Sequence, residues 1–179
     1  MIRNVSHKMY LLRRTNNYLT EKSSLMVYKL FILPLMEYGN ILYMKSCNKL
    51  LDKLQRIQNQ CLNICLNQDI RSSTAEIHKK ANLNYLNERR QKQLLKTMYS
   101  RSKNSKYQDE NNYNVKTRSN TVSKLHVPKF KNAQAKKSIL FHGSSTWNDL
   151  PYNLKKIEVK NLFSYKIDKL YKDKIKEYC

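Results

Sequence analysis

Hydrophobic residues recur along this chain mostly at the three- and four-residue intervals of an amphipathic helix. Residues 6–18 are predicted to form a first helix with a basic exposed face. Thr20, followed directly by Glu21, is typical of a helix start, because the hydroxyl can cap the first turn and the carboxylate suits the positive end of the helix dipole. Residues 25–42 are apolar nearly all round, which predicts a core helix buried on most sides and kinked at Pro34.

Three more helices are expected before residue 103. Asn48 is predicted to cap a helix that is apolar on one face and basic on the other. The apolar face consists of Leu50, Leu54, Ile57, Cys61 and Cys65, and the opposite face of Lys49, Lys53, Arg56 and Gln60. A shorter helix carrying Ile77 should begin within residues 72–74, and another is predicted over residues 86–102, with Leu94, Leu95 and Met98 inward.

The last part of the chain is less regular. Residues 103–120 have scarcely any aliphatic side chain and are predicted to be a flexible linker. Beyond them, residues 125–127 and 138–142 are expected as short strands, with a turn at Gly143 followed by Ser144 and Ser145. A final amphipathic helix is expected from Val159 or Asn161, with an apolar face made of Leu162, Phe163, Ile167, Leu170 and Tyr171.

Together these elements predict a mainly α protein, a helical bundle with a small C-terminal α+β appendage. The chain has only two glycines and three prolines, which favours long helices over strands and turns. Four regions are expected. They are a helical region over residues 1–70, a helical extension over 71–102, the linker over 103–120, and a C-terminal block with short strands and a final helix over 121–179.

The charge balance narrows the choice of partners. With 35 Lys and Arg against 13 Asp and Glu, the formal net charge is +22, so the partners expected are polyanions. The apolar stretch near Phe31 is interrupted by charged residues and by Pro34, so no membrane span or secretory signal is expected. A membrane-surface helix is disfavoured because the basic residues are spread over several helices. The predicted location is intracellular, in the nucleus or the cytoplasm.

The sequence lacks the usual arrangements of catalytic residues. It has no D-x-D and no adjacent aspartates to hold two metal ions, and the pair Asp109 and Glu110 falls in the predicted linker. The two glycines are far apart, which excludes a phosphate-binding glycine loop, and the four histidines have no diagnostic neighbours. No catalysis, cofactor or metal is therefore expected. A zinc site would have to combine Cys47, Cys61, Cys65 and His78, and reduced thiols packed in a core are the favoured alternative.

Basic residues are repeatedly paired with tyrosine. The pairs are Lys8 with Tyr10, Arg13 and Arg14 with Tyr18, and Lys96 with Tyr99 and Arg101. Lys and Arg can neutralise phosphates, and tyrosine can stack on bases, so these pairs suit RNA or DNA. The phosphate contacts predicted are Lys8, Arg13, Arg14, Lys53, Arg56, Arg89 and Arg90. The alternative for each residue is an ordinary solvated charged face.

Several segments resemble one protein family in order and spacing. They are MYLLRRTNNYLT with EKSSLMVYKLFILPLMEYGNILYM (9–44), LLDKLQRIQNQCLNICL (50–66), STAEIHKKANLNYLNERR (73–90), TRS (117–119), Val127 with Pro128, and KSILFHGSSTWNDLP (137–151). This series resembles the thumb and C-terminal region of non-LTR retrotransposon reverse transcriptases of the LINE-like, jockey or CR type.

The resemblance implies a role in holding nucleic acid. Residues 1–70 would correspond to the thumb, which grips template and primer, and residues 71–179 to the downstream extension, which helps to engage RNA and target DNA. The fingers and the palm with its catalytic aspartates have no counterpart in the sequence, so a catalytically incomplete fragment of an RNA-directed DNA polymerase is expected. The alternatives are an inactive expressed remnant or a helical protein-interaction domain.

Overall fold

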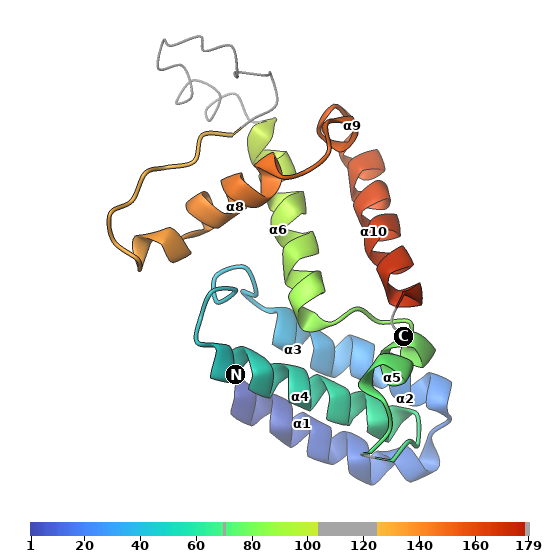
Figure 1. The fold of residues 1–179 in the computed structure, drawn as a ribbon. Coiled ribbons are helices and arrows are strands. Elements are labelled where there is room, and N and C mark those ends of the chain that lie inside the picture. Colours follow the sequence, from blue (N-terminus) through green and yellow to red (C-terminus); the bar gives the residue numbers. More distant parts are fainter. Residues whose placement is uncertain (70, 104–124, 178–179) are drawn as a thin grey trace, which may run out of the picture. The chain divides into compact units, whose positions relative to one another are not determined.

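The computed structural model describes residues 1–69, 71–103 and 125–177. The chain forms two compact units, one made of Met1–Arg90 with Tyr171–Cys179 and the other of Gln91–Leu170. All regular secondary structure in the described residues is helical, which confirms the mainly α prediction (Figure 1). The boundaries between the units fall inside two helices, α6 (Leu86–Ser102) and α10 (Lys160–Lys176).

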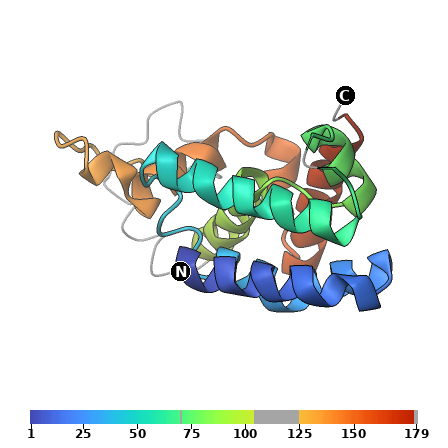
Figure 2. The same ribbon diagram turned by 90° about the horizontal axis from the view of Figure 1, so that it is seen from below.

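The first unit is built on three helical arms that lie side by side (Figures 1 and 2). The first arm is α1 (Ile2–Thr15) with the 3-10 turn η1 (Asn16–Tyr18). The second runs through α2 (Glu21–Val27), η2 (Tyr28–Ile32) and α3 (Leu33–Glu37), and the third is α4 (Asn48–Cys65). The short helix α5 (Thr74–Ala81) follows. The two views agree that α1 and α4 run in the same direction.

The start of the second arm confirms the predicted cap. The Thr20 hydroxyl accepts a hydrogen bond from the Ser23 backbone N–H, and Glu21 lies in the first turn. Before Pro34 the helix widens into a π turn, in which the Leu33 N–H bonds to the Tyr28 carbonyl five residues back. Proline has no N–H, and its ring crowds the carbonyl four residues earlier, so a wider turn accommodates it without ending the helix.

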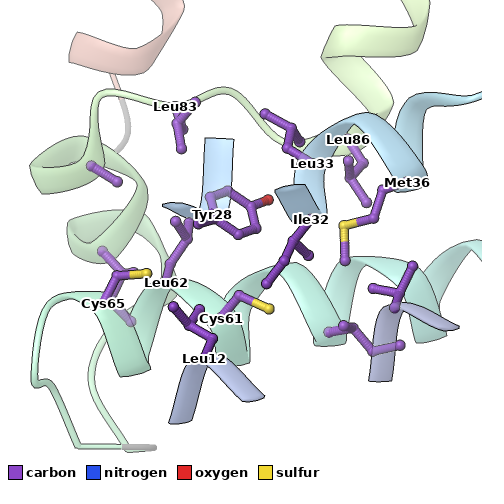
Figure 3. Packing of buried hydrophobic residues seen from close by; sticks show 14 of the residues in the cluster. Leu12, Tyr28, Ile32, Leu33, Met36, Cys61, Leu62, Cys65, Leu83 and Leu86 are labelled. Atoms are coloured by element: carbon purple, nitrogen blue, oxygen red, sulfur yellow. The ribbon is translucent and has the colours of Figure 1, made fainter. Parts of the chain in front are cut away.

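A buried hydrophobic cluster holds the three arms together. Figure 3 shows Leu12 from α1, Tyr28 and Ile32 from η2, and Cys61 and Leu62 from α4 pointing toward one another. Of the predicted apolar face of α4, four positions are buried, and Leu50 is exposed near the start of the helix. Asn48 is the first residue of α4, not its cap, because the cap position belongs to Cys47, which makes no side-chain hydrogen bond there.

Buried amides join the arms by hydrogen bonds. Asn16 donates to the Ile64 carbonyl at 2.8 Å and accepts from the Ser24 hydroxyl, so it connects η1 with both α2 and α4. In α4, Gln58 donates to the Asn84 carbonyl at 3.3 Å. A buried polar group without a partner costs about 1–3 kcal/mol, so these bonds favour one arrangement of the arms.

The prediction that residues 25–42 form a helix buried on most sides is wrong. Tyr28, Ile32, Leu33 and Met36 are buried. Large apolar side chains on the other face of this arm, Met26, Leu30 and Phe31, are exposed, and so are Tyr38 and Leu42 directly after it. The α-helical part also ends at Glu37. The apolar residues around this arm therefore form two faces. One face packs in the core, and nothing in the first unit covers the other.

The second unit is organised by aromatic packing within its own residues. Its elements are the second part of α6, the turn η3 (Ala135–Lys137), α8 (Ile139–Asn148), α9 (Tyr152–Lys155) and the first part of α10. Tyr99 stacks on Phe163 with ring centroids 4.4 Å apart, and Trp147 lies 5.8 Å from Phe163. All three rings are buried. The predicted inward residues of α6, Leu94, Leu95 and Met98, are buried as well.

The strand and turn predictions for the C-terminal block are wrong within the described residues. Residues 125–127 form no strand, and residues 139–142 begin α8, whose cap is Ser138 with its hydroxyl accepting from the Phe141 N–H. Gly143 lies inside this helix, where a Cβ would approach the Met98 sulfur to 2.5 Å. The glycine thus permits close helix packing and makes no turn. A short apolar run is compatible with a strand or with a helix, and the cap at Ser138 favours the helix.

In the final helix, Phe163, Ile167 and Tyr171 are buried as predicted, whereas Leu162 and Leu170 are exposed. The predicted linker over residues 103–120 lies, apart from Lys103, outside the described residues, as do Asp109 and Glu110.

Candidate nucleic-acid interface

Helix α1 carries an exposed basic surface. It contains Arg3, Lys8, Arg13 and Arg14, and no acidic residue occurs in residues 1–20. Arg3, Arg13 and Arg14 are exposed, and Lys8 is partly buried. The inner face of the helix is held by Val5 and Leu12, which belong to the buried cluster of the first unit. The packing that forms α1 therefore directs its guanidinium groups outward.

Helix α4 adds a second basic stripe beside the first. Lys49, Lys53 and Arg56 are exposed on the side opposite the buried face, as predicted. Asp52 is the only acidic residue in α4. The two helices are in contact. Five of the seven predicted contacts, Lys8, Arg13, Arg14, Lys53 and Arg56, thus lie on two adjoining helices of one unit.

These basic groups have no carboxylate partner. Within the described residues, Arg3, Lys8, Arg13, Arg14, Lys49, Lys53 and Arg56 form no ion pair. Neither α1 nor α4 has an acidic residue in its first turn, so the positive end of each helix dipole is not offset there. The α1–α4 surface is defined as these seven residues, and it carries a large excess of positive charge, with Asp52 as the acidic residue of its two helices.

The remaining two predicted contacts differ from the other five. Arg89 forms an ion pair with Glu37, on α3. Arg90 is only 4% exposed, although the sequence places it on a polar face. Its guanidinium lies 5.6 Å from the centroid of the Tyr43 ring, and burial lowers its pKa below the ordinary arginine value. The expectation that Arg90 is exposed is wrong, because α6 turns this residue toward the interior.

The basic residues in the second part of α6 are also paired. Lys92 and Lys96 both contact Asp168 on α10, at 3.1 and 2.9 Å. Burial alone would raise the pKa of the Asp168 carboxyl, but hydrogen bonds from Lys96 and Lys92 outweigh burial and lower it. Tyr99, predicted to join these residues in base stacking, is buried, and its hydroxyl donates to the Glu158 carbonyl.

The cysteines and the histidine considered for a zinc site have separate places in the packing of the first unit. Cys61 and Cys65 are buried, and burial raises the pKa of each thiol to about 12. His78 is buried too, and burial lowers its pKa, so the ring is neutral near pH 7. Its Nδ1 lies 2.8 Å from the Leu83 carbonyl and donates to it, because a carbonyl only accepts. No group of His, Cys, Asp and Glu side chains in the described part of the chain could hold a metal ion.

Two members of the α1–α4 surface were absent from the predicted contacts, Arg3 and Lys49. Arg3 was missed because the helix was predicted to begin at residue 6, whereas α1 begins at Ile2 without a side-chain cap to mark it. The sequence feature that indicates Arg3 as a contact is its spacing from Arg14, which is three helical turns and places both residues on the same face. Lys49 belongs to the predicted basic face of α4, and its side chain is exposed like those of Lys53 and Arg56.

Comparison with known proteins identifies no relative. No protein-family model matches the chain, and neither a curated protein nor a solved structure is significantly similar to it. Among the helices described, none is both long enough and apolar enough to cross a membrane.

Proposed function

We propose that this protein binds nucleic acid through the phosphate groups, using the α1–α4 surface. The observation that carries the proposal is that two adjoining helices present seven basic residues with no ion pair among the described residues, in a chain of net charge +22. Such a surface attracts a polyanion and releases its counterions. The contacts are phosphate contacts, so little sequence preference is expected.

The resemblance of the sequence to a reverse transcriptase thumb and its downstream region points in the same direction. It makes the bound molecule an RNA, a DNA or a hybrid of the two, handled in the nucleus or the cytoplasm. The matching segments belong to the part of that family that holds nucleic acid and not to its catalytic palm, so binding without polymerisation is the proposed activity.

The test is the salt dependence of binding to a labelled oligonucleotide. Each phosphate contact contributes roughly 0.7–0.9 to the slope of log affinity against log salt concentration. Replacing Arg13, Arg14, Lys53 and Arg56 by Ala should therefore lower this slope by roughly three. Because all four side chains are exposed, circular dichroism should show unchanged helicity.

A matched control removes the same charge elsewhere. Lys160, Lys166, Lys169 and Lys172 are exposed on α10 and form no ion pair within the described residues. Their replacement by Ala should lower the slope much less than the α1–α4 variant does. Equal reductions in the two variants would mean that diffuse charge, and not this surface, attracts the nucleic acid. Absence of binding at 50 mM salt would refute the function itself.

A second candidate function, protein binding, is favoured by the exposed apolar face of the second arm. Its members are Met26, Leu30 and Phe31, and the exposed Tyr38 and Leu42 follow directly after the arm. A face of this kind is typical of a protein contact. The charge of +22 opposes association of two copies, and Lys22 and Lys29 are exposed on the same arm, so the partner expected is an acidic protein with an apolar ridge. Leu30→Glu with Phe31→Glu should abolish binding of such a partner and leave the salt slope for oligonucleotides nearly unchanged.

A further inference from the structure

Of the tyrosines that accompany basic residues in the sequence, one is buried in the structure and two are exposed. Tyr99 is buried in the aromatic core of the second unit, stacked on Phe163. By contrast, Tyr10 is 53% exposed and Tyr18 is 90% exposed. Neither of these two side chains contributes to the buried cluster of the first unit. Their position at the surface therefore has no explanation in the packing of the protein.

Tyr10 and Tyr18 belong to a stripe along the outer face of α1 and η1. Arg3, His7, Tyr10 and Arg14 follow one another at intervals of four, three and four residues, which places them on one side of α1, and Tyr18 follows four residues later in the 3-10 turn η1. All five are exposed. Arg3 and His7 precede the first tyrosine, and Arg14 lies between the two tyrosines in the series, with its guanidinium 5.8 Å from the centroid of the Tyr10 ring.

The helix beneath the stripe is packed and hydrogen-bonded to the rest of the first unit. Val5 and Leu12 anchor the opposite face of α1 in the core, and the buried Asn16 ties η1 to α2 and α4 by hydrogen bonds. Tyr10 and Tyr18 are eight residues apart, roughly 13 Å along the axis, since the 3-10 turn η1 rises more per residue than α1 does. The two rings are therefore presented at a set separation, with cationic groups next to them to neutralise phosphates.

We propose that this stripe binds single-stranded nucleic acid, with bases stacked on Tyr10 and Tyr18 and phosphates contacting Arg3 and Arg14. The assignment rests on the proposed function and specifies its substrate. In a duplex, both faces of each base are covered by its neighbours, so a duplex offers the stripe its phosphates but not its base faces. A single strand offers both, and stacking on aromatic side chains tolerates any base.

The experiment compares three ligands of the same length with the full chain. They are an oligothymidylate, an abasic strand with the same phosphates and no bases, and a duplex. The oligothymidylate is expected to bind at least tenfold more tightly than the abasic strand. Tyr10→Ala with Tyr18→Ala should reduce oligothymidylate affinity roughly tenfold or more, to the level of the abasic strand, because each stacked base contributes roughly fivefold or more.

Two further variants distinguish stacking from loss of structure. Tyr10→Phe with Tyr18→Phe should retain the preference for bases, since the rings remain. Tyr165→Ala removes a tyrosine that is 65% exposed on α10 and outside the stripe, and should leave oligothymidylate affinity unchanged. The salt slope of the double alanine variant should stay that of the wild type, because no charge is lost.

The outcomes separate the inference from the function on which it rests. Equal affinity for the oligothymidylate and the abasic strand, or a preference for the duplex, overturns the single-strand assignment and leaves phosphate binding by the α1–α4 surface in place. Failure to bind all three ligands overturns both. A loss of affinity in the Tyr165→Ala variant as large as that in the double variant also overturns the assignment, because any exposed tyrosine would then suffice.

Discussion

Two basic regions of this protein have similar sequences and different surroundings. The end of α1 carries Arg13 and Arg14, and the start of α6 carries Arg89 and Arg90, each pair adjacent and within an amphipathic helix. Arg13 and Arg14 are exposed without an ion pair among the described residues, whereas Arg89 is paired with Glu37 and Arg90 is buried over Tyr43. The difference teaches that basic charge in a sequence becomes available to a ligand only where the fold leaves it unpaired and exposed.

The same contrast extends along α6. Lys92 and Lys96 share the Asp168 carboxylate, so in this helix basic residues help to hold α6 and α10 together within the second unit. Substitutions in α6 should therefore act mainly on stability, and substitutions in α1 and α4 mainly on binding. This is the distinction that the following experiments address.

The largest effect on stability is expected at Arg90. Arg90→Ala removes a buried side-chain stem and its contact with the Tyr43 ring, and should lower the free energy of unfolding by about 2 kcal/mol in urea denaturation. Arg90→Met keeps most of the packing and removes a buried charge, so its cost should be much smaller. If Arg90→Ala lowered the salt slope of oligonucleotide binding and left stability intact, the distinction between the two regions would fail.

A smaller effect is expected at Asp168. Its carboxylate is 42% exposed, so Asp168→Asn should cost less than about 1 kcal/mol at neutral pH. The lowered pKa of Asp168 means that the folded state holds the ionised form more strongly than the unfolded state does. The stability from this group is thus complete above its ordinary pKa of 3.8 and is lost as pH falls through the lower value in the folded state.

The measurement for Asp168 is the difference in unfolding free energy between wild type and Asp168→Asn as a function of pH. The difference should be largest above about pH 4 and should shrink on acidification, because other titrating groups are common to both proteins. A difference that stayed constant with pH would show that Lys92 and Lys96 do not stabilise the ionised carboxylate.

The smallest effect on stability is expected at Arg14. Its side chain is exposed and lies near the Tyr10 ring, so Arg14→Ala should change the unfolding free energy by less than about 0.5 kcal/mol. The same variant should lower the salt slope of oligonucleotide binding by about 0.7–0.9, the contribution of one phosphate. Loss of stability comparable to that of Arg90→Ala would place Arg14 among the structural arginines.

Much of the secondary structure followed from local pattern. The bounds of α6, the cap at Thr20 and the buried face of α4 agree with the prediction, because caps and apolar stripes act over one or two turns. Residues 138–142 were predicted as a strand because their short apolar run suits either structure, and the packing of Gly143 against Met98 lies outside any local window. Arg3, the first residue of the candidate stripe, falls outside the predicted helix for a similar local reason, the uncapped start at Ile2.

The sequence by itself determined that the protein is helical, strongly basic and equipped with basic and aromatic residues at helical spacing. Only the tertiary structure decided which of those residues are available. The partners that neutralise Arg89 and Lys96 lie 52 and 72 residues away along the chain, and the residues that bury Tyr99 are equally remote in sequence. Charge and helix periodicity are properties of neighbouring residues, whereas exposure and pairing depend on segments that only folding brings together.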